Sequence, residues 1–312
     1  MKLLKRISLG CLVLVVALIL IVAVSAGVMM LLGPPEQRPE HATQSQAVET
    51  PRLPEAAFPA PGEVTIPPLS LRVNLDLAEG EFRILRGEPG EGIRIEADYD
   101  SGVYELEQEH RPGKGGIEEV EIRFHSKYSI MRRLLTMGAV EPDNRIKIYL
   151  PPDIPMSIDG QVRMGESKLD LTGLAITGVD LSLEMGEHDL VFDEPNPLGM
   201  EELRVYVSKG EFNLKGLGNA GFQSASIQGS MGEANIDLTG AYRADALVHT
   251  RFRMGEMTIT VPEDIHVNIQ PGMVFLGERR VSVDESGDIP EGAPTLEVRS
   301  SLSMGELRIR SR

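Results

Sequence analysis

The sequence predicts an all-β fold, a single-stranded β-solenoid of stacked coils, and three observations support this prediction. The tripeptide Met-Gly-Glu recurs, alternating apolar and polar residues flank each copy, and the 312 residues include 32 Gly and no Trp. Full copies of the tripeptide lie at 164–166, 185–187, 231–233, 254–256 and 304–306, with weaker copies at 209–211, 276–278 and 79–81. From Gly165 onward the glycines are 21, 24, 22, 23, 22 and 28 residues apart, a repeat length typical of solenoids.

Each repeat is predicted to be two strand segments that meet at its glycine. Apolar residues fall three and one positions before the glycine and four and usually six after it, as with Val162, Met164, Leu169 and Leu171. The inward residues therefore lie an odd number of positions before the glycine and an even number after it. The two-residue period of a strand is broken there, which requires one inserted residue at the glycine. A glycine at such a bulge or corner can take the positive φ that the kink needs. The predicted structural glycines are Gly165, Gly186, Gly210, Gly232, Gly255, Gly277 and Gly305.

The residues beside the glycine are predicted to form two rows. The methionines before it should point inward and fill the core, with soft-metal binding by their thioethers as the alternative. The glutamates after it should point outward as a glutamate row, made of Glu166, Glu187, Glu211, Glu233, Glu256, Glu278 and Glu306. Two interpretations of this row stay open. It keeps a repetitive β surface soluble, or Glu166, Glu187, Glu211, Glu233 and Glu256 form a linear site for divalent cations or a cationic envelope partner.

Residues 1–32 are predicted to be an N-terminal transmembrane anchor. Ile7 to Leu32 contains no charge and as a helix would be about 39 Å long, against roughly 30 Å of hydrocarbon. The run is too long for the apolar part of a typical signal peptide, which favours an uncleaved anchor over cleavage after Ala26. Because Lys2, Lys5 and Arg6 precede the run, the N-terminus should be cytoplasmic and the rest outside. Cys11, the only cysteine, has too few apolar residues before it for a lipoprotein signal, so the exported part has no disulfide.

Residues 33–68 are predicted to be a flexible linker, and residues 69–312 the folded domain. The linker has little periodicity and is rich in proline, with Pro34, Pro35, Pro39, Pro51, Pro54, Pro59, Pro61, Pro67 and Pro68. The domain begins with alternating segments at 71–75, 82–84, 93–95 and 120–124, separated by glycine-rich turns. Ser129 to Gly138 breaks this pattern and is predicted to be a short amphipathic helix or an apolar loop that covers the open end of the stack, with membrane contact as the alternative.

One segment carries a family resemblance. Ile146 to Leu150 ends in Pro151 and is followed by a turn, a second strand, a glycine-centred kink and the run Leu171-Thr172-Gly173-Leu174. This pattern resembles the toast-rack putative adhesin domains and is similar to the C-terminal domains of bacterial cell-wall-active antibiotic response proteins. The resemblance implies an envelope-associated β-solenoid without established catalytic residues. Met-Gly-Glu stands where many of these domains have Gly-Ala-Gly, so the resemblance implies the fold and not a shared binding surface.

Composition and motifs narrow the functional classes. The formal net charge is −16, and a phosphate backbone would be repelled, so nucleic acid is not expected as a partner. The histidines share no metal-ligand spacing, no nucleophile motif is recognisable, and no cofactor is expected beyond weak divalent cation binding. The sequence therefore predicts a non-enzymatic, single-pass protein of the bacterial cytoplasmic membrane whose periplasmic or extracellular β-solenoid is an envelope scaffold or adhesin-like interaction module. The alternatives are a sensor or regulator of envelope stress acting through the membrane helix, and a β-helix polysaccharide-active enzyme, which 4% aromatic residues disfavour.

Overall fold

The computed structural model describes residues 41–47, 70–113, 116–128, 143–283 and 289–312. Almost all of them belong to one compact unit, residues 41–127 and 141–312. The second unit, residues 1–40 and 128–140, lies almost wholly outside the described residues, as do the predicted anchor, Cys11 and the segment from Ser129 to Gly138. Within the described part of the chain, the structure contains no helix with the length and apolar character that crossing a membrane requires.

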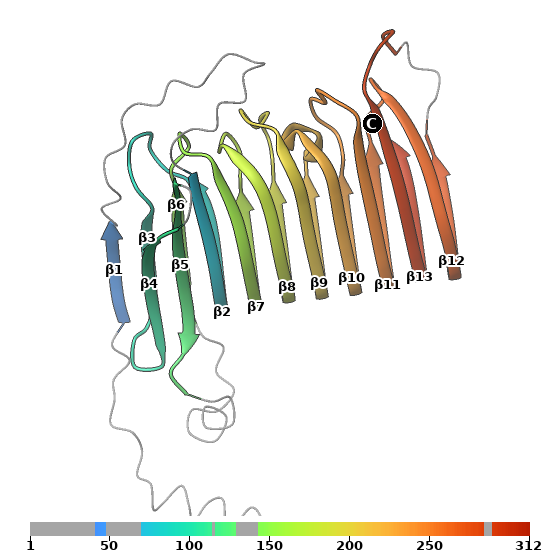
Figure 1. The fold of residues 1–312 in the computed structure, drawn as a ribbon. Coiled ribbons are helices and arrows are strands. Elements are labelled where there is room, and N and C mark those ends of the chain that lie inside the picture. The colour runs from blue at the N-terminus through green and yellow to red at the C-terminus, as the bar shows by residue number, and fades with distance from the viewer. Residues whose placement is uncertain (1–40, 48–69, 114–115, 129–142, 284–288) are drawn as a thin grey trace, which may run out of the picture. The chain divides into compact units, whose positions relative to one another are not determined.

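The unit is built from one continuous, mainly parallel β-sheet, as the sequence predicts (Figure 1). The strands that carry the repeats are β2 (Ser70–Arg86), β7 (Met156–Asp170), β8 (Ile176–Val191), β9 (Met200–Lys215), β10 (Phe222–Asp237), β11 (Ala246–Val261), β12 (His266–Ser282) and β13 (Thr295–Ser311). They stack in the order β2-β7-β8-β9-β10-β11-β13-β12, so the last strand of the chain lies between β11 and β12. A short 3₁₀ helix, η2 (Leu217–Ala220), lies in the connection between β9 and β10.

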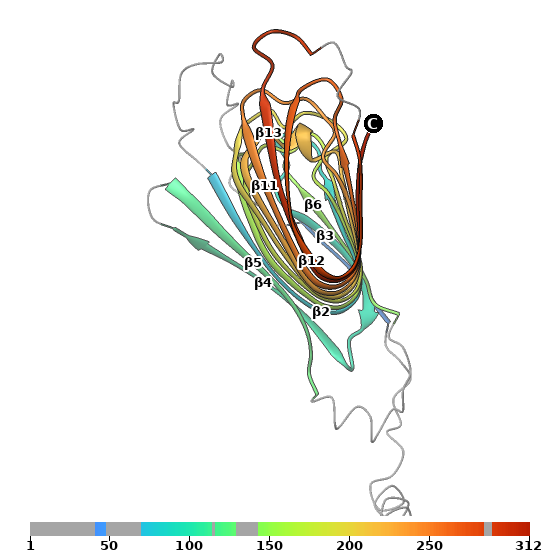
Figure 2. The same cartoon turned by 90° about the vertical axis from the view of Figure 1, so that its right-hand side faces the viewer.

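Each long strand bends near its middle, so that the sheet folds into a U-shaped trough with two facing arms (Figure 2). The core fills the space between the arms. Val162 before the bend of β7 is 3% exposed, and Leu169 after it is 2% exposed. The same alternation of buried and partly exposed residues runs through both arms, because successive side chains of a strand point to opposite faces.

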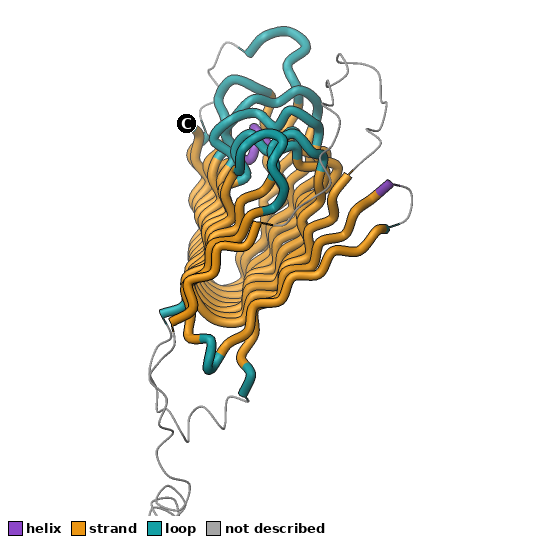
Figure 3. Tube along the Cα trace, turned by 90° about the vertical axis from the view of Figure 1, so that its left-hand side faces the viewer, coloured by secondary structure: helices purple, strands orange, loops and turns teal. Residues whose placement is uncertain are grey.

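Neighbouring strands are paired in register, so equivalent residues of the repeats form straight rows along the stack (Figure 3). Gly165 pairs with Gly186, Gly186 with Gly210, Gly210 with Gly232, and Gly232 with Gly255. The row continues through Gly305 and Gly277 at one end and Gly80 at the other. All eight of these glycines have positive φ, between 116° and 152°.

At the N-terminal end of the stack, two short strands continue the parallel pairing of β2, and antiparallel strands pair with these in turn. β5 (Ile117–Ser126) pairs with the first arm of β2 and β6 (Arg145–Leu150) with its second arm. β4 (Tyr104–Pro112) pairs with β5, and β3 (Arg94–Asp100) pairs with β6. At this end Phe124 packs its ring against Phe82, Tyr99 and Tyr104 with centroid distances of 6.0, 5.3 and 5.2 Å. A strand β1 (His41–Ala47), within the predicted linker, pairs with β3 and so differs from the unstructured chain expected there.

The inward position of the methionines is the main prediction that the structure contradicts. Met164, Met185, Met231, Met254 and Met304 are 44, 45, 47, 40 and 41% exposed. The residues directly before and after each glycine lie on the outer surface of the bend, and the inward series resumes two positions after the glycine. At that inward position stand Ser167, His188, Phe212, Ala234, Met257 and Leu307, which are buried. The thioethers therefore do not fill the core. The alternation of inward and outward side chains in the arms does not continue through the bend, and the geometry of the bend turns the methionines outward.

Candidate functional site

The outer surface of the bend is the feature that every repeat contributes to. Directly before the glycines lies a row that we call the methionine row: Met164, Met185, Lys209, Met231, Met254, Met304 and Leu276, in the order of the stack. Directly after the glycines lies the predicted glutamate row, which the structure extends by Glu81. In the order of the stack it is Glu81, Glu166, Glu187, Glu211, Glu233, Glu256, Glu306 and Glu278. Neighbours in each row are about 4.8 Å apart along the stack, because paired strands have that spacing.

Local chemistry explains why the sequence bends here. Each glycine of the row has a φ that residues with a side chain rarely adopt. A Cβ on Gly232 would overlap the carbonyl oxygen of Gly210, and one on Gly80 would lie 2.8 Å from the carbonyl oxygen of Asn144. Gly80 is the last glycine of the row, and on its far side Asn144 takes the place that a further glycine would have. The carbonyl of Asn144 accepts from Glu81 N (2.8 Å) and its side-chain amide donates to Glu79 O (3.0 Å). The glycine row thus leaves a track without side chains between the methionine and glutamate rows.

Ion pairs of the glutamate row lie at its ends and not in its middle, although the charge of Arg308 also reaches Glu256 and Glu233. Arg83 Nε donates to Glu81 at 2.7 Å, and Arg280 lies 2.8 Å from Glu278. Arg308 Nε donates to Glu306 at 2.7 Å, and this hydrogen bond, supported by the charges of Arg308 and Arg280, holds the pKa of Glu306 below its usual range. Within the described residues, no Lys or Arg nitrogen lies within 4 Å of a carboxylate oxygen of the five predicted candidates, Glu166, Glu187, Glu211, Glu233 and Glu256.

The polar neighbours of the central glutamates are amides. Asn213 donates to Glu211 at 3.2 Å and also to Asp189 at 3.1 Å, and Asn235 donates to Glu233 at 3.3 Å. A shallow groove of about 190 Å³ lies at the N-terminal end of the row. Glu166, Glu187 and Asp189 line it together with Arg83 and Lys168. The row is therefore a line of exposed and partly exposed carboxylates, with one from each strand.

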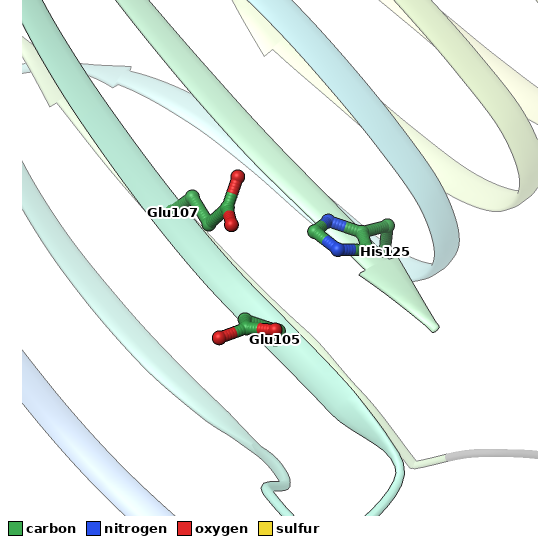
Figure 4. Close-up of side chains that lie close together, drawn as sticks. All are labelled: Glu105, Glu107 and His125. Atoms are coloured by element: carbon green, nitrogen blue, oxygen red, sulfur yellow. The ribbon is translucent and has the colours of Figure 1, made fainter. Parts of the chain in front are cut away.

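Metal-ligating side chains converge elsewhere, on the outward face of the β4–β5 hairpin. Glu105, Glu107 and His125 each offer one ligand atom, and these atoms lie within 4.8 Å of one another (Figure 4). Glu105 is paired directly with His125 across the two strands, and Glu107 lies two residues along the same face. Carboxylate oxygens and an imidazole suit a divalent ion such as Zn²⁺, but Arg123 Nε is 3.1 Å from Glu107 and already neutralises one of the two carboxylates.

Sequence reasoning missed this cluster because His125 and Glu105 are 20 residues apart and share no motif. Their proximity follows only from the pairing of β4 with β5. The alternation of both segments and the glycine-rich turn at 113–116 would indicate a hairpin, which is the one sequence signal that could place these residues opposite each other.

A buried Ser-His pair was also missed. Ser167 Oγ and His188 Nδ1 are 2.8 Å apart in adjacent strands, and the two residues are 4 and 0% exposed. Burial lowers the pKa of His188 to about 4, with a smaller opposing effect from Asp189. His188 Nε2 has no hydrogen-bond partner in the described part of the chain, so no carboxylate orients the ring. An imidazole of such low basicity, shut away from solvent, does not activate a serine, and we assign the pair to packing at the bend.

Comparison of the sequence with protein-family models and with curated protein sequences gives no match. Among solved structures, the chain is similar to a putative cell adhesion protein from Clostridium sporogenes, with 16% identity, a TM-score of 0.46, and coverage of 88% of this chain and 100% of that chain. A putative adhesin from Bacteroides fragilis matches with 10% identity, a TM-score of 0.38 and coverage of 88 and 98%. A putative adhesin from Parabacteroides merdae matches with 10% identity, a TM-score of 0.35 and coverage of 89 and 98%.

Proposed function

We propose that this chain is a non-enzymatic interaction module of the bacterial cell envelope, in which the membrane anchor holds the β-solenoid outside the cytoplasm as a scaffold or adhesin-like surface. The observation that carries the proposal is the outer surface of the bend. There the stack presents two rows of exposed or partly exposed side chains, one largely apolar and one acidic, along its long direction.

The exposure of the methionine row supports binding in preference to a purely structural role. The core of the same strands is complete without it, since Met257 and Ile259 of β11 are 0% exposed while Met254 is 40% exposed. Large apolar side chains that repeat on an exposed surface are typical of interaction sites, because burying them against a partner removes apolar area from water. Their regular spacing favours an extended partner over a small ligand.

Photo-crosslinking in intact cells tests this proposal. A benzophenone amino acid at position 254, on the bend, is compared with one at position 251, which is exposed on the first arm of the same strand. We expect covalent adducts with an envelope component from position 254 and none from position 251. Absence of adducts from position 254 in the full-length, membrane-held chain would remove the bend as an interaction surface.

The regulator alternative gives a different result in a second arm of the same experiment. Residues 7–32 are replaced by an unrelated transmembrane helix of the same length, and the crosslinks from position 254 are measured again. A scaffold needs only an anchor, so we expect the adducts to persist. If the adducts disappear while the amount and membrane location of the protein stay the same, contacts made by the native helix are part of the function.

A further inference from the structure

The C-terminal part of the stack carries an uninterrupted apolar stretch of the methionine row. Met231, Met254, Met304 and Leu276 follow one another on β10, β11, β13 and β12, and are 47, 40, 41 and 54% exposed. Lys209 separates this stretch from Met164 and Met185. From Met231 to Leu276 the stretch is about 14 Å long, at about 4.8 Å for each of the steps between strands.

Acidic side chains run beside this stretch at a constant distance. Glu233, Glu256, Glu306 and Glu278 are each two residues after the corresponding apolar side chain, across the track left by the glycines. Arg308 and Arg280 pair with the last two, whereas no Lys or Arg nitrogen of the described residues lies within 4 Å of the Glu233 or Glu256 carboxylates, which feel the charge of Arg308 only at longer range. A partner that fits this surface needs an apolar line and, parallel to it, a line of positive charge.

From this geometry we propose that the stretch from Met231 to Leu276, with its flanking glutamates, binds a cationic amphipathic α-helix of a partner protein, which lies across the strands. An α-helix advances about 5.4 Å per turn, so one apolar residue per turn meets the methionine row at steps of about 4.8 Å with a mismatch of less than 2 Å over four strands. A Lys or Arg displaced around the same helix faces the glutamate row. The inference rests on the proposed function, since it names the kind of partner that the bend binds.

Charge disfavours the other occupants of this surface. An anionic membrane surface would be repelled by the glutamate row. A second copy related by a two-fold axis would place glutamates opposite glutamates or opposite methionines, depending on the axis. Either arrangement leaves carboxylates repelled or desolvated without a partner.

A synthetic peptide provides the probe. The full-length chain is held in nanodiscs of zwitterionic lipid and titrated with a helical Lys/Leu peptide of about four turns, which carries one Trp on its apolar face. The protein has no Trp, so the Trp emission reports the peptide alone, and empty nanodiscs provide the blank. A Glu/Leu peptide of the same pattern and a scrambled Lys/Leu peptide are the comparison probes.

We expect saturable binding of the Lys/Leu helix that weakens as salt rises, and no saturable binding of the other two peptides. Met254→Gln with Met304→Gln should weaken binding about tenfold, as should Glu233→Gln with Glu256→Gln, which should also reduce the salt dependence. Glu201→Gln and Arg251→Gln, exposed on the arms, are the matched controls and should leave binding unchanged.

Three results would overturn the inference: no saturable binding of the Lys/Leu helix, equal binding of the Glu/Leu peptide, or equal effects of the bend and control substitutions. Crosslinking of one copy to another through position 254 in cells would also overturn it, in favour of a second copy as the occupant. The outcome is separable from that of the proposed function. Adducts from position 254 with some other envelope component, together with failed peptide binding, would leave an interaction module with a partner of different chemistry.

Discussion

Gly186 lies so close to Gly165 across the pairing of β7 with β8 that a Cβ on Gly186 would overlap the carbonyl oxygen of Gly165. Gly186 also has a φ of 144°, which is unfavourable for any residue with a side chain. We therefore expect Gly186→Ala to destabilise the domain by more than about 2 kcal/mol, and Gly186→Val by more, through backbone strain and displacement of the neighbouring strand. Urea unfolding of the full chain, followed by circular dichroism, measures the difference.

Glu187→Gln is the matched control for this substitution, because Glu187 is the next residue and is exposed on the bend. Exposed substitutions of this kind change the free energy of unfolding by about 0.5 kcal/mol or less. Equal stability of the Gly186 and Glu187 variants would show that the bend accepts a side chain at the glycine row.

Met254 and Met257 provide a test of the direction of the methionine row within one strand. Met257 is 0% exposed and Met254 is 40% exposed. Met257→Ala should cost about 2–4 kcal/mol in the free energy of unfolding because it opens a cavity in the core, whereas Met254→Ala should change it by about 0.5 kcal/mol or less. Thermal unfolding of the two variants measures this contrast. A larger loss from Met254→Ala would mean that this methionine packs inward.

His188 should make the stability of the domain depend on pH. Its pKa is lowered to about 4 in the folded chain and returns to about 6.5 on unfolding, so between these values the unfolded chain binds a proton that the folded chain does not. Above about pH 6.5 His188 is neutral in both states and has no effect on the pH dependence. As the pH falls from 6.5 toward 4, the free energy of unfolding falls with it, by up to about 3 kcal/mol.

The free energy of unfolding, measured between pH 7.5 and 4.5 for the wild type and for His188→Leu, checks this dependence. The variant should show a shallower fall with decreasing pH, whatever its stability at pH 7.5. The same slope in both proteins would mean that other groups cause the loss in acid.

Asn196 should contribute more stability than a loop residue usually does. It is 3% exposed, and its amide donates to the carbonyls of Ile176 (2.7 Å) and Ala220 (3.0 Å) while its Oδ1 accepts from Ile176 N (3.2 Å). It thereby joins β8 to the end of η2. Asn196→Ala should cost about 2–4 kcal/mol because it leaves buried backbone groups without partners. Asn219→Ala, which removes two bonds at a less buried position, should cost less, and chemical denaturation of both variants measures the order.

The predicted topology can be tested with reporters fused to the C-terminus. Because three cationic residues precede the uncharged run from Ile7 to Leu32, an alkaline-phosphatase fusion after Arg312 should be active in cells. A reporter that works only in the cytoplasm, fused at the same place, should be inactive. The reverse result would place the β-solenoid on the cytoplasmic side.

The architecture was predictable because its determinant repeats. A glycine with positive φ is required at every bend, so selection for the bend leaves the same residue at Gly165, Gly186 and the equivalent positions, and the period is visible without a structure. The weak copies at 209–211 and 276–278 pair in register with the full copies, so even an incomplete repeat predicted a coil.

The direction of the methionines was not predictable from hydrophobic alternation. Alternation assumes a step of two residues between inward positions, but at the bend of β8 the step from Leu183 to His188 is five residues. The inward position after the glycine is also occupied by unlike residues, including Ser167 and His188, and carries no apolar signal. The neighbouring methionine row is apolar at every position except Lys209 although it is exposed. Asn196, Glu105 and His125 were missed for another reason, since their contacts are with residues distant in the sequence and no repeat reproduces them.

The position of β13 between β11 and β12 has a consequence for how the protein is assembled. Translation delivers β12 before β13, yet β12 pairs only with β13 within the described residues. Until the final residues emerge, β11 keeps an open edge and β12 has no sheet to join. Addition of coils in chain order from the N-terminus therefore stops at β11. The stack is complete only when the C-terminal strand β13 has inserted between β11 and β12. A chain that ends even a few residues before Thr295 would lose two coils and not one.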